Sequence, residues 1–184
     1  MSPMPSGRAI LDSERLLQEA GLSLDMSYAD LGSGMLGHFV LPASQIVGPN
    51  GTVYAVDILK TALQSVESRA QLKALTNVQS VWGDLEHPNG IHLPANALDL
   101  VSFVNMAHLL QTSVVPLQHA KRLLHAGGHV LVIDWNPQAG SLLVSQEHRV
   151  SSEDIKQRFL AQGFSLTKQF IAGPQHWGLL FERP

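Results

Sequence analysis

The stretch Ala29-Asp30-Leu31-Gly32-Ser33-Gly34-Met35-Leu36-Gly37 decides the fold of this 184-residue chain. It closes a short segment, residues 26–31, whose texture predicts a strand. Glycines at positions 32 and 34 allow a tight turn and let the backbone come close to a ligand. The following residues, 38–47, have the length of a helix, and the N-terminus of a helix favours a bound carboxylate or phosphate. The stretch therefore predicts a strand, a turn and a helix that share one ligand site.

Strand-like and helix-like segments alternate along the rest of the chain. The predicted strands cover residues 52–58, 77–84, 97–105, 129–135, 165–172 and 176–184, and the predicted helices cover residues 8–20, 59–75, 113–126 and 151–163. This order predicts a doubly wound, Rossmann-like α/β fold, with a mostly parallel sheet between helices and a C-terminal antiparallel hairpin. Because no linker divides the chain, we expect a single domain over residues 1–184. Within it, residues 1–7 are expected to be disordered and residues 26–183 to form the core.

The composition excludes several classes of function. The formal net charge is −3, and no long run of like charges occurs, so the sequence predicts no nucleic-acid partner. The chain has no cysteine, which excludes disulfides, thiolate catalysis and thiolate metal sites. There is no signal-peptide pattern and no apolar run long enough to span a membrane. We therefore expect a cytoplasmic protein without a membrane span.

Polar residues stand at the ends of four predicted strands, where open α/β sheets bind their ligands. Asp30, just before the glycine turn, can receive an ammonium group. Asp57 ends the next strand, and its two acceptor oxygens suit the two hydroxyls of a ribose. Asp84 can accept a hydrogen bond from an exocyclic amine such as that of adenine, and Asn105 lies at the far edge of the same cleft. Together these groups match S-adenosylmethionine, which has an ammonium, a ribose diol and an adenine but no phosphate.

The motifs resemble those of class I S-adenosylmethionine-dependent methyltransferases, most closely the branch of the ubiquinone and menaquinone C-methyltransferases. The similar segments are ADLGSGMLG, residues 29–37; GPNGTVYAVDI, residues 48–58; LLHAGGHVLVIDW, residues 123–135; and HWGLLFERP, residues 176–184. The resemblance implies a seven-stranded sheet, with the sixth strand at the edge and the last strand antiparallel. It also implies S-adenosylmethionine as the cofactor.

The same resemblance assigns a role to each matched position. Around the methionine moiety it places Asp30, Gly32 and Gly34, with Asn105 near by. At the ribose it places Asp57, and at the adenine it places Ile58, Asp84 and Leu85.

Other interpretations of these residues stay open. The letters GSGMLG also fit the dinucleotide pattern, which would indicate an NAD(P)-dependent oxidoreductase. A non-catalytic cofactor-binding protein on the same fold is a further alternative. Structurally, Asp57, Asp84 and Asn105 could each cap a helix. Against the oxidoreductase, an Asp directly before the glycine turn serves a pyrophosphate poorly.

Two of the nine histidines, His108 and His38, lie beside the predicted cleft. Either could act as a general base if the acceptor must lose a proton, with His108 the first candidate. A histidine at a helix start can equally be a purely structural residue. No histidine spacing fits a metal site, so no metal is expected. We therefore expect methyl transfer to a small-molecule acceptor by in-line displacement, with Trp135 as a candidate wall of the acceptor pocket.

Overall fold

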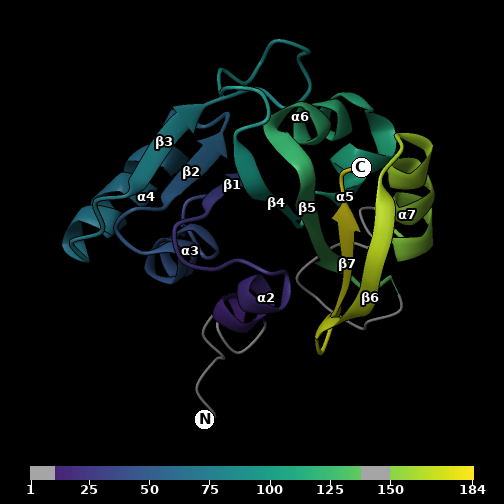
Figure 1. Ribbon diagram of the computed structural model, residues 1–184, viewed down its shortest axis with the longest axis horizontal. Helices are drawn as coiled ribbons and strands as arrows, with labels where there is room; N and C mark the ends of the chain where they lie inside the picture. The colour runs from purple at the N-terminus through teal and green to yellow at the C-terminus, as the bar shows by residue number, and fades with distance from the viewer. Residues whose placement is uncertain (1–10, 138–149) are drawn as a thin grey trace.

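Seven strands form one mixed sheet in the computed structural model, which describes residues 11–137 and 150–184 (Figure 1). The strands are β1 (Ser27–Leu31), β2 (Thr52–Asp57), β3 (Val78–Trp82), β4 (Leu98–Val104), β5 (Leu124–Trp135), β6 (Ser165–Gly173) and β7 (His176–Glu182). Their order is β3-β2-β1-β4-β5-β7-β6. Strands β1 to β5 pair in parallel, and β7 runs antiparallel between β5 and the edge strand β6. The predicted fold class is confirmed, including the edge position of the sixth strand.

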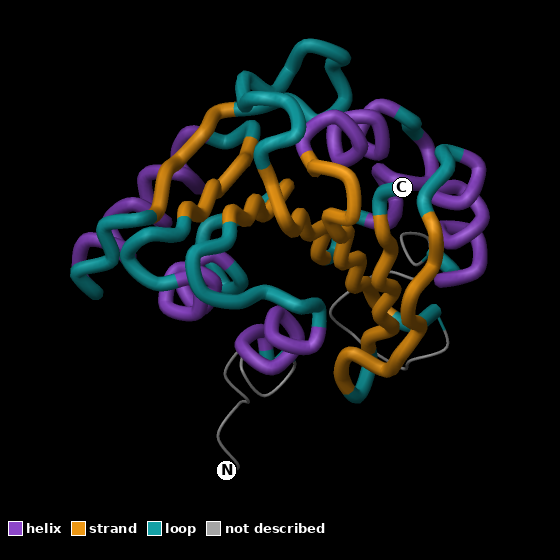
Figure 2. Tube along the Cα trace, in the orientation of Figure 1, coloured by secondary structure: helices purple, strands orange, loops and turns teal. Residues whose placement is uncertain are grey.

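Helices cover both faces of the sheet, and Figure 2 shows them in purple around the orange strands. On one face lie α2 (Ser13–Glu19), α3 (Val40–Val47) and α4 (Lys60–Leu72); the other face carries α5 (Ala107–Thr112), α6 (Val115–Leu123) and α7 (Ser152–Ala161). Successive strand residues point to opposite faces of the sheet. Tyr28 packs in the hydrophobic cluster on the first face, and Ala29 packs in the cluster on the second. Both faces of the central strands are therefore buried, which explains their near-continuous apolar sequence.

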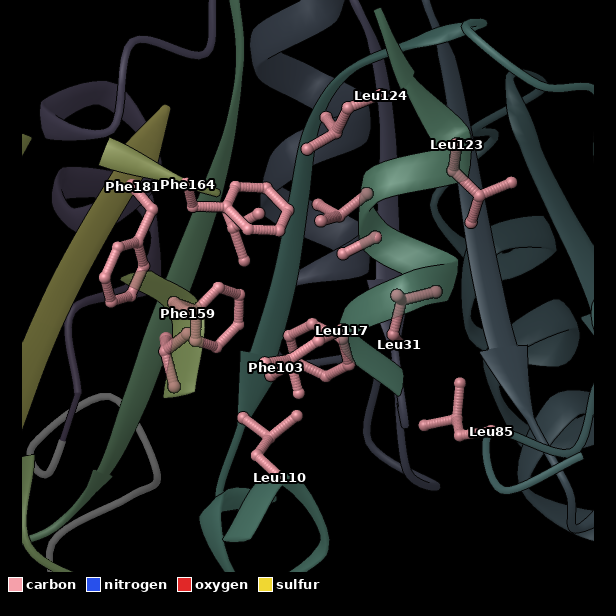
Figure 3. Close-up of a cluster of buried hydrophobic side chains, with 14 of the residues drawn as sticks. Leu31, Leu85, Phe103, Leu110, Leu117, Leu123, Leu124, Phe159, Phe164 and Phe181 are labelled. Atoms are coloured by element: carbon pink, nitrogen blue, oxygen red, sulfur yellow. The ribbon is translucent and has the colours of Figure 1, made fainter. Parts of the chain in front are cut away.

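Aromatic side chains join the C-terminal hairpin to the second face (Figure 3). The ring of Phe159 in α7 stacks on that of Phe181 in β7 with centroids 4.4 Å apart, and it meets Phe164 edge-on at 5.2 Å. All three side chains are buried beside Phe103 of β4. This packing fixes the hairpin against β5, so the start of β7 takes a defined place at the end of the sheet.

Three expectations about individual elements were wrong. The helix expected over 113–126 ends at Leu123, and the next residues already belong to β5. The reason is tertiary: Leu124 pairs with Leu98 of β4, and this pairing overrides the local helical pattern. The short helix α5 was not expected, because six residues are too few to show a helical period. The helix expected over 59–75 ends at Leu72, near Ala74 with its φ of 53°.

The N-terminal helix is shorter than expected within the described residues. It begins after Asp12, whose side chain accepts a hydrogen bond from the Arg15 amide at 3.2 Å. The expected disorder over 1–7 and the expected helical residues 8–10 lie outside the described residues. Pro42 occupies the first turn of α3, where its missing N–H removes no helical hydrogen bond.

Candidate functional site

Two adjoining cavities open at the carboxyl ends of the parallel strands. The first, which we call the strand-end cavity, has a volume of about 490 Å³, and its walls include Asp57, Ile58, Asp84, Leu85 and His108. The second, which we call the hairpin cavity, has a volume of about 350 Å³, and its walls include Asp30, Ser33, Met35, His38, Trp135 and His176. Gly32, Gly34, Val104 and Asn105 line both cavities. Each volume falls within the range of small-ligand pockets.

The Asp57 carboxylate connects the glycine turn to the end of β2. Its Oδ2 accepts a hydrogen bond from the Gly34 amide at 2.9 Å, and its Oδ1 accepts one from the Leu59 amide at 2.9 Å. Each oxygen keeps a further lone pair for a ligand hydroxyl. The Leu59 contact gives Asp57 a role at the start of α4 as well, so its structural and binding roles can coexist.

A long loop, residues 83–97, contributes residues 83–86 to the wall of the strand-end cavity. The Asp84 amide donates to the Gly90 carbonyl at 3.0 Å, and the Asp84 carboxylate accepts from the Glu86 amide at 2.9 Å. Arg122 of α6 holds the loop through its guanidinium, which donates to the carbonyls of Ile91 and Leu93 at 2.8 and 2.7 Å. Helix α6 therefore positions Asp84 in the cavity wall.

The apolar members of this wall differ in exposure. Leu85 is buried, whereas the Ile58 side chain is 53% exposed. The Trp82 indole supports Ile58 by donating to its carbonyl at 2.9 Å. An exposed branched side chain beside a cavity offers a surface on which a flat ring can lie.

Asp30 lies at the floor of the hairpin cavity and is 3% exposed. The Ser102 hydroxyl donates to its Oδ1 at 2.6 Å, and the Tyr28 hydroxyl lies 2.5 Å from the Ser102 oxygen. Burial raises the pKa of Asp30 to about 7. A cation at this carboxylate would favour its ionised form, so the position suits an ammonium group.

Asn105 adopts a left-handed conformation, with φ of 58°, between the two cavities. Met106 rather than Asn105 occupies the cap position of α5, so the alternative role as a helix cap is not observed. Beside it, the Met106 side chain comes within 3.0 Å of the position that a Cβ on Gly32 would take. Any side chain at position 32 would therefore meet Met106, and the φ of 88° adds strain.

The two candidate bases line different cavities. His108 is exposed on α5 in the strand-end cavity, and His38 is half-buried in the hairpin cavity. The His38 Nε2 lies 3.1 Å from the Leu11 carbonyl oxygen, to which it must donate. Only Nδ1 of His38 is then able to accept a proton.

His176 belongs to the hairpin cavity but was not singled out from the sequence. It opposes Trp135 in the antiparallel β5–β7 pairing, which places both side chains on one face of the sheet. Their rings lie 4.1 Å apart with a tilt of 40°. His176 is 2% exposed, and burial lowers its pKa to about 4. A pairing between strands far apart in sequence left no local signal for this residue.

Asp134 fixes the end of β5 beside this pair. Its Oδ1 accepts from the Trp135 amide and its Oδ2 from the Ala107 amide, both at 2.7 Å. Burial raises the pKa of Asp134. The carboxylate therefore joins the strand that carries Trp135 to the helix that carries His108.

These residues fit S-adenosylmethionine in chemistry. The buried Ser33 hydroxyl, which has no hydrogen-bond partner within residues 11–137 and 150–184, can serve a polar group of the methionine end. A Cβ built on Gly34 would meet no atom within 4 Å, so the turn leaves open space for a ligand. Asp30 suits the ammonium, Asp57 the ribose, and Asp84 the adenine amine. Among the described residues that line the strand-end cavity there is no lysine or arginine, which suits a cofactor without phosphate.

Residues 11–137 and 150–184 contain no group of three or more His, Asp or Glu side chains placed to hold a metal ion. None of the helices in these ranges has the length and apolarity needed to cross a membrane.

Comparison with known families shows what the chain is related to. A family model described as "Methyltransferase domain" matches residues 22–178. The chain belongs to the methyltransferase domain family. This membership decides against the nicotinamide oxidoreductase. The ubiquinone and menaquinone branch stays a prediction.

Solved structures share the fold of this methyltransferase. A SAM-dependent methyltransferase from Aquifex aeolicus superimposes with a TM-score of 0.88 at 24% identity, over 97% of this chain and 93% of that one. Fibrillarin from Aeropyrum pernix, crystallised with natively bound S-adenosyl-L-methionine, gives a TM-score of 0.69 at 16% identity, over 92% and 75% of the chains.

A curated relative overturns the expected partners. An RNA 2'-O-methyltransferase of Mus musculus is 30% identical over 126 residues, which is 65% of this chain but 39% of the relative. The expectation of a small-molecule acceptor and no nucleic acid is therefore wrong. It rested on net charge, which sums the whole surface. Unpaired RNA bases can instead be recognised by stacking on aromatic side chains, for which net charge is no guide.

Proposed function

We propose that this methyltransferase transfers a methyl group to a ribose hydroxyl of RNA. The observation that carries the proposal is the junction of two cavities around Gly32, Gly34 and Asn105. The strand-end cavity has the groups for the nucleoside of the cofactor, while the hairpin cavity would hold its amino-acid end at Asp30 and offers space beside Trp135 for a second molecule. The similarity to an RNA 2'-O-methyltransferase supports a hydroxyl of RNA as the acceptor.

The cofactor supplies an electrophilic methyl group when it is bound. The task of the protein is to hold donor and acceptor in line and to exclude water, which can lower a barrier by roughly 7–11 kcal/mol. Asp57, Ile58, Asp84 and Leu85 would hold the nucleoside part of the cofactor, and Asp30 its ammonium. A displacement of this kind needs no metal.

A ribose hydroxyl loses its proton as it is methylated, so a nearby base would help. His38 lines the cavity assigned to the acceptor, and its Nδ1 is free of the Leu11 contact. His108 lines the cavity assigned to the nucleoside. The geometry therefore favours His38 over His108 for this role, which reverses the order expected from the sequence.

The proposal is tested by incubating the purified protein with S-adenosylmethionine labelled in its methyl group and single-stranded RNA transcripts. A methylated 2'-hydroxyl blocks alkaline cleavage of the neighbouring phosphodiester, so the label should appear in alkali-resistant dinucleotides. Matched DNA strands, which lack the hydroxyl, should remain unlabelled. Label in alkali-released mononucleotides would contradict the ribose as acceptor, and unlabelled RNA would contradict an RNA acceptor.

A matched variant links the reaction to the strand-end cavity. Asp57→Ala should abolish labelling of the RNA, because it removes the carboxylate assigned to the ribose of the cofactor. Glu67→Ala, which changes an exposed carboxylate on α4, should label RNA as the wild type does. Equal labelling by Asp57→Ala would contradict the assignment.

A further inference from the structure

The hairpin cavity contains a buried polar side chain that neither the fold nor the cofactor assignment explains. Neither ring nitrogen of His176 has a hydrogen-bond partner within residues 11–137 and 150–184, although the residue is 2% exposed. Leaving a buried polar group unsatisfied costs about 1–3 kcal/mol. His176 lines the cavity, so a ligand there could satisfy its nitrogens.

Around His176 the wall is largely apolar and partly aromatic, and its further polar residues are Asp30, Ser33, His38 and Asn105. Trp135 lies against His176 at 4.1 Å, and the buried ring of Phe39 forms another part of the wall. Met35 and Leu36 line the same cavity, although their side chains are 57% and 61% exposed. Large apolar side chains exposed beside a cavity indicate a surface that a ligand covers. Flat aromatic side chains next to a polar imidazole suit a planar heteroaromatic ring.

We propose that the hairpin cavity binds one unpaired nucleobase of the RNA acceptor, against the Trp135–His176 pair, with His176 hydrogen-bonded to the edge of the base. This inference rests on the proposed function, since it names the part of the RNA that the protein recognises. The cavity shares Gly32, Gly34 and Asn105 with the cofactor site, so a nucleotide bound there lies next to the methyl donor.

The state of the imidazole suits recognition of a base edge. Because burial holds the pKa of His176 near 4, its ring is neutral at physiological pH and has one N–H donor and one acceptor nitrogen. Nucleobase edges likewise combine donors and acceptors. A neutral imidazole with this low basicity is a recognition group rather than a base. His176 is therefore not a second candidate for the general base proposed at His38.

The first test compares RNA methylation by His176→Phe and by the wild type. Phenylalanine keeps a flat ring against Trp135 but has no hydrogen-bonding atoms. We expect kcat/KM for single-stranded RNA to fall by about tenfold, mainly through KM, while the Kd for S-adenosylmethionine stays the same. His129→Phe changes a β5 histidine that lines neither cavity and should behave as the wild type. RNA methylation unchanged in a folded His176→Phe protein would overturn the assignment.

The second test needs neither a variant at position 176 nor methylation. The protein has three tryptophans, whose indole signals can be followed by NMR and assigned with Trp135→Phe. S-adenosylhomocysteine is added first to fill the cofactor site, and adenosine or uridine is then titrated in. We expect the Trp135 signal to shift, while those of Trp82 and Trp177 stay in place.

The two tests separate failure of this inference from failure of the proposed function. If the wild type methylates no RNA, the proposed function fails, and the nucleoside titration still decides the cavity. A shift of Trp135 would then support the base site, and the absence of a shift would overturn it. If RNA is methylated but Trp135 stays unshifted and His176→Phe is fully active, only the inference is overturned.

Discussion

The strand-end cavity and the hairpin cavity adjoin each other but are built in different ways. Asp57 and Ile58 come from the end of one parallel strand, where the fold itself places a ligand site. Trp135 and His176 meet only because β7 turns back along β5. A site made of strand ends can be seen in the sequence, whereas the contact between Trp135 and His176 depends on a pairing of distant segments that the sequence does not show.

The largest effect should come from the strand-end cavity. We expect Asp57→Ala to weaken S-adenosylmethionine binding by about 100-fold, because it removes charge-assisted hydrogen bonds worth about 1.5–3 kcal/mol each. It also removes the acceptor of the Gly34 amide. Isothermal titration calorimetry measures the loss, with Glu67→Ala as the control. An affinity within a factor of two of the wild type would remove Asp57 from the site.

A pH effect should come from Asp30, which lies at the hairpin cavity. The raised pKa of Asp30, about 7 in the free protein, leaves the carboxyl neutral below pH 7 and ionised above it. If the ionised form receives the ammonium, S-adenosylmethionine affinity should rise about eightfold from pH 6 to pH 7.5. Asp30→Asn, which cannot ionise, should bind equally at both pH values. If the affinity of Asp30→Asn rose in the same way, the pH dependence would belong to another group.

A smaller effect should come from the loop that carries Asp84 in the wall of the strand-end cavity. Arg122→Met removes the donors to the carbonyls of Ile91 and Leu93, so Asp84 is held less firmly. We expect about a fivefold weaker binding of S-adenosylmethionine, equivalent to one neutral hydrogen bond. Lys121→Met is the matched control, because Lys121 Nζ donates instead to the Gln162 carbonyl at 2.7 Å. Equal losses in both variants would indicate general destabilisation rather than a loop effect.

The sequence predicted the elements whose signals are local. The glycine turn and each acidic residue directly follow a strand along the chain. Pattern and spacing therefore sufficed to predict their positions at the strand ends. The boundary between α6 and β5 was misplaced, because the pairing of Leu124 with Leu98 is decided by the sheet. The role of Asp134 also depends on a contact with Ala107 that no spacing reveals.

The same limit applies to function. The cofactor groups were predicted from residue types that match the ligand part by part, and these assignments stay predictions. The expected partners were wrong, because net charge describes the whole chain and gives no guide to a single cavity such as the one lined by Trp135 and His176. Burial and the absence of hydrogen-bond partners at His176 became visible only in three dimensions.

A crystal structure of the protein with S-adenosylhomocysteine tests the central claim most directly. The account predicts the ribose hydroxyls within hydrogen-bonding distance of the Asp57 carboxylate and the amino-acid end at Asp30 and the glycine turn. The hairpin cavity beside Trp135 should remain open to a second molecule. A sugar bound away from Asp57, or a product molecule that fills the space beside His176, would contradict it.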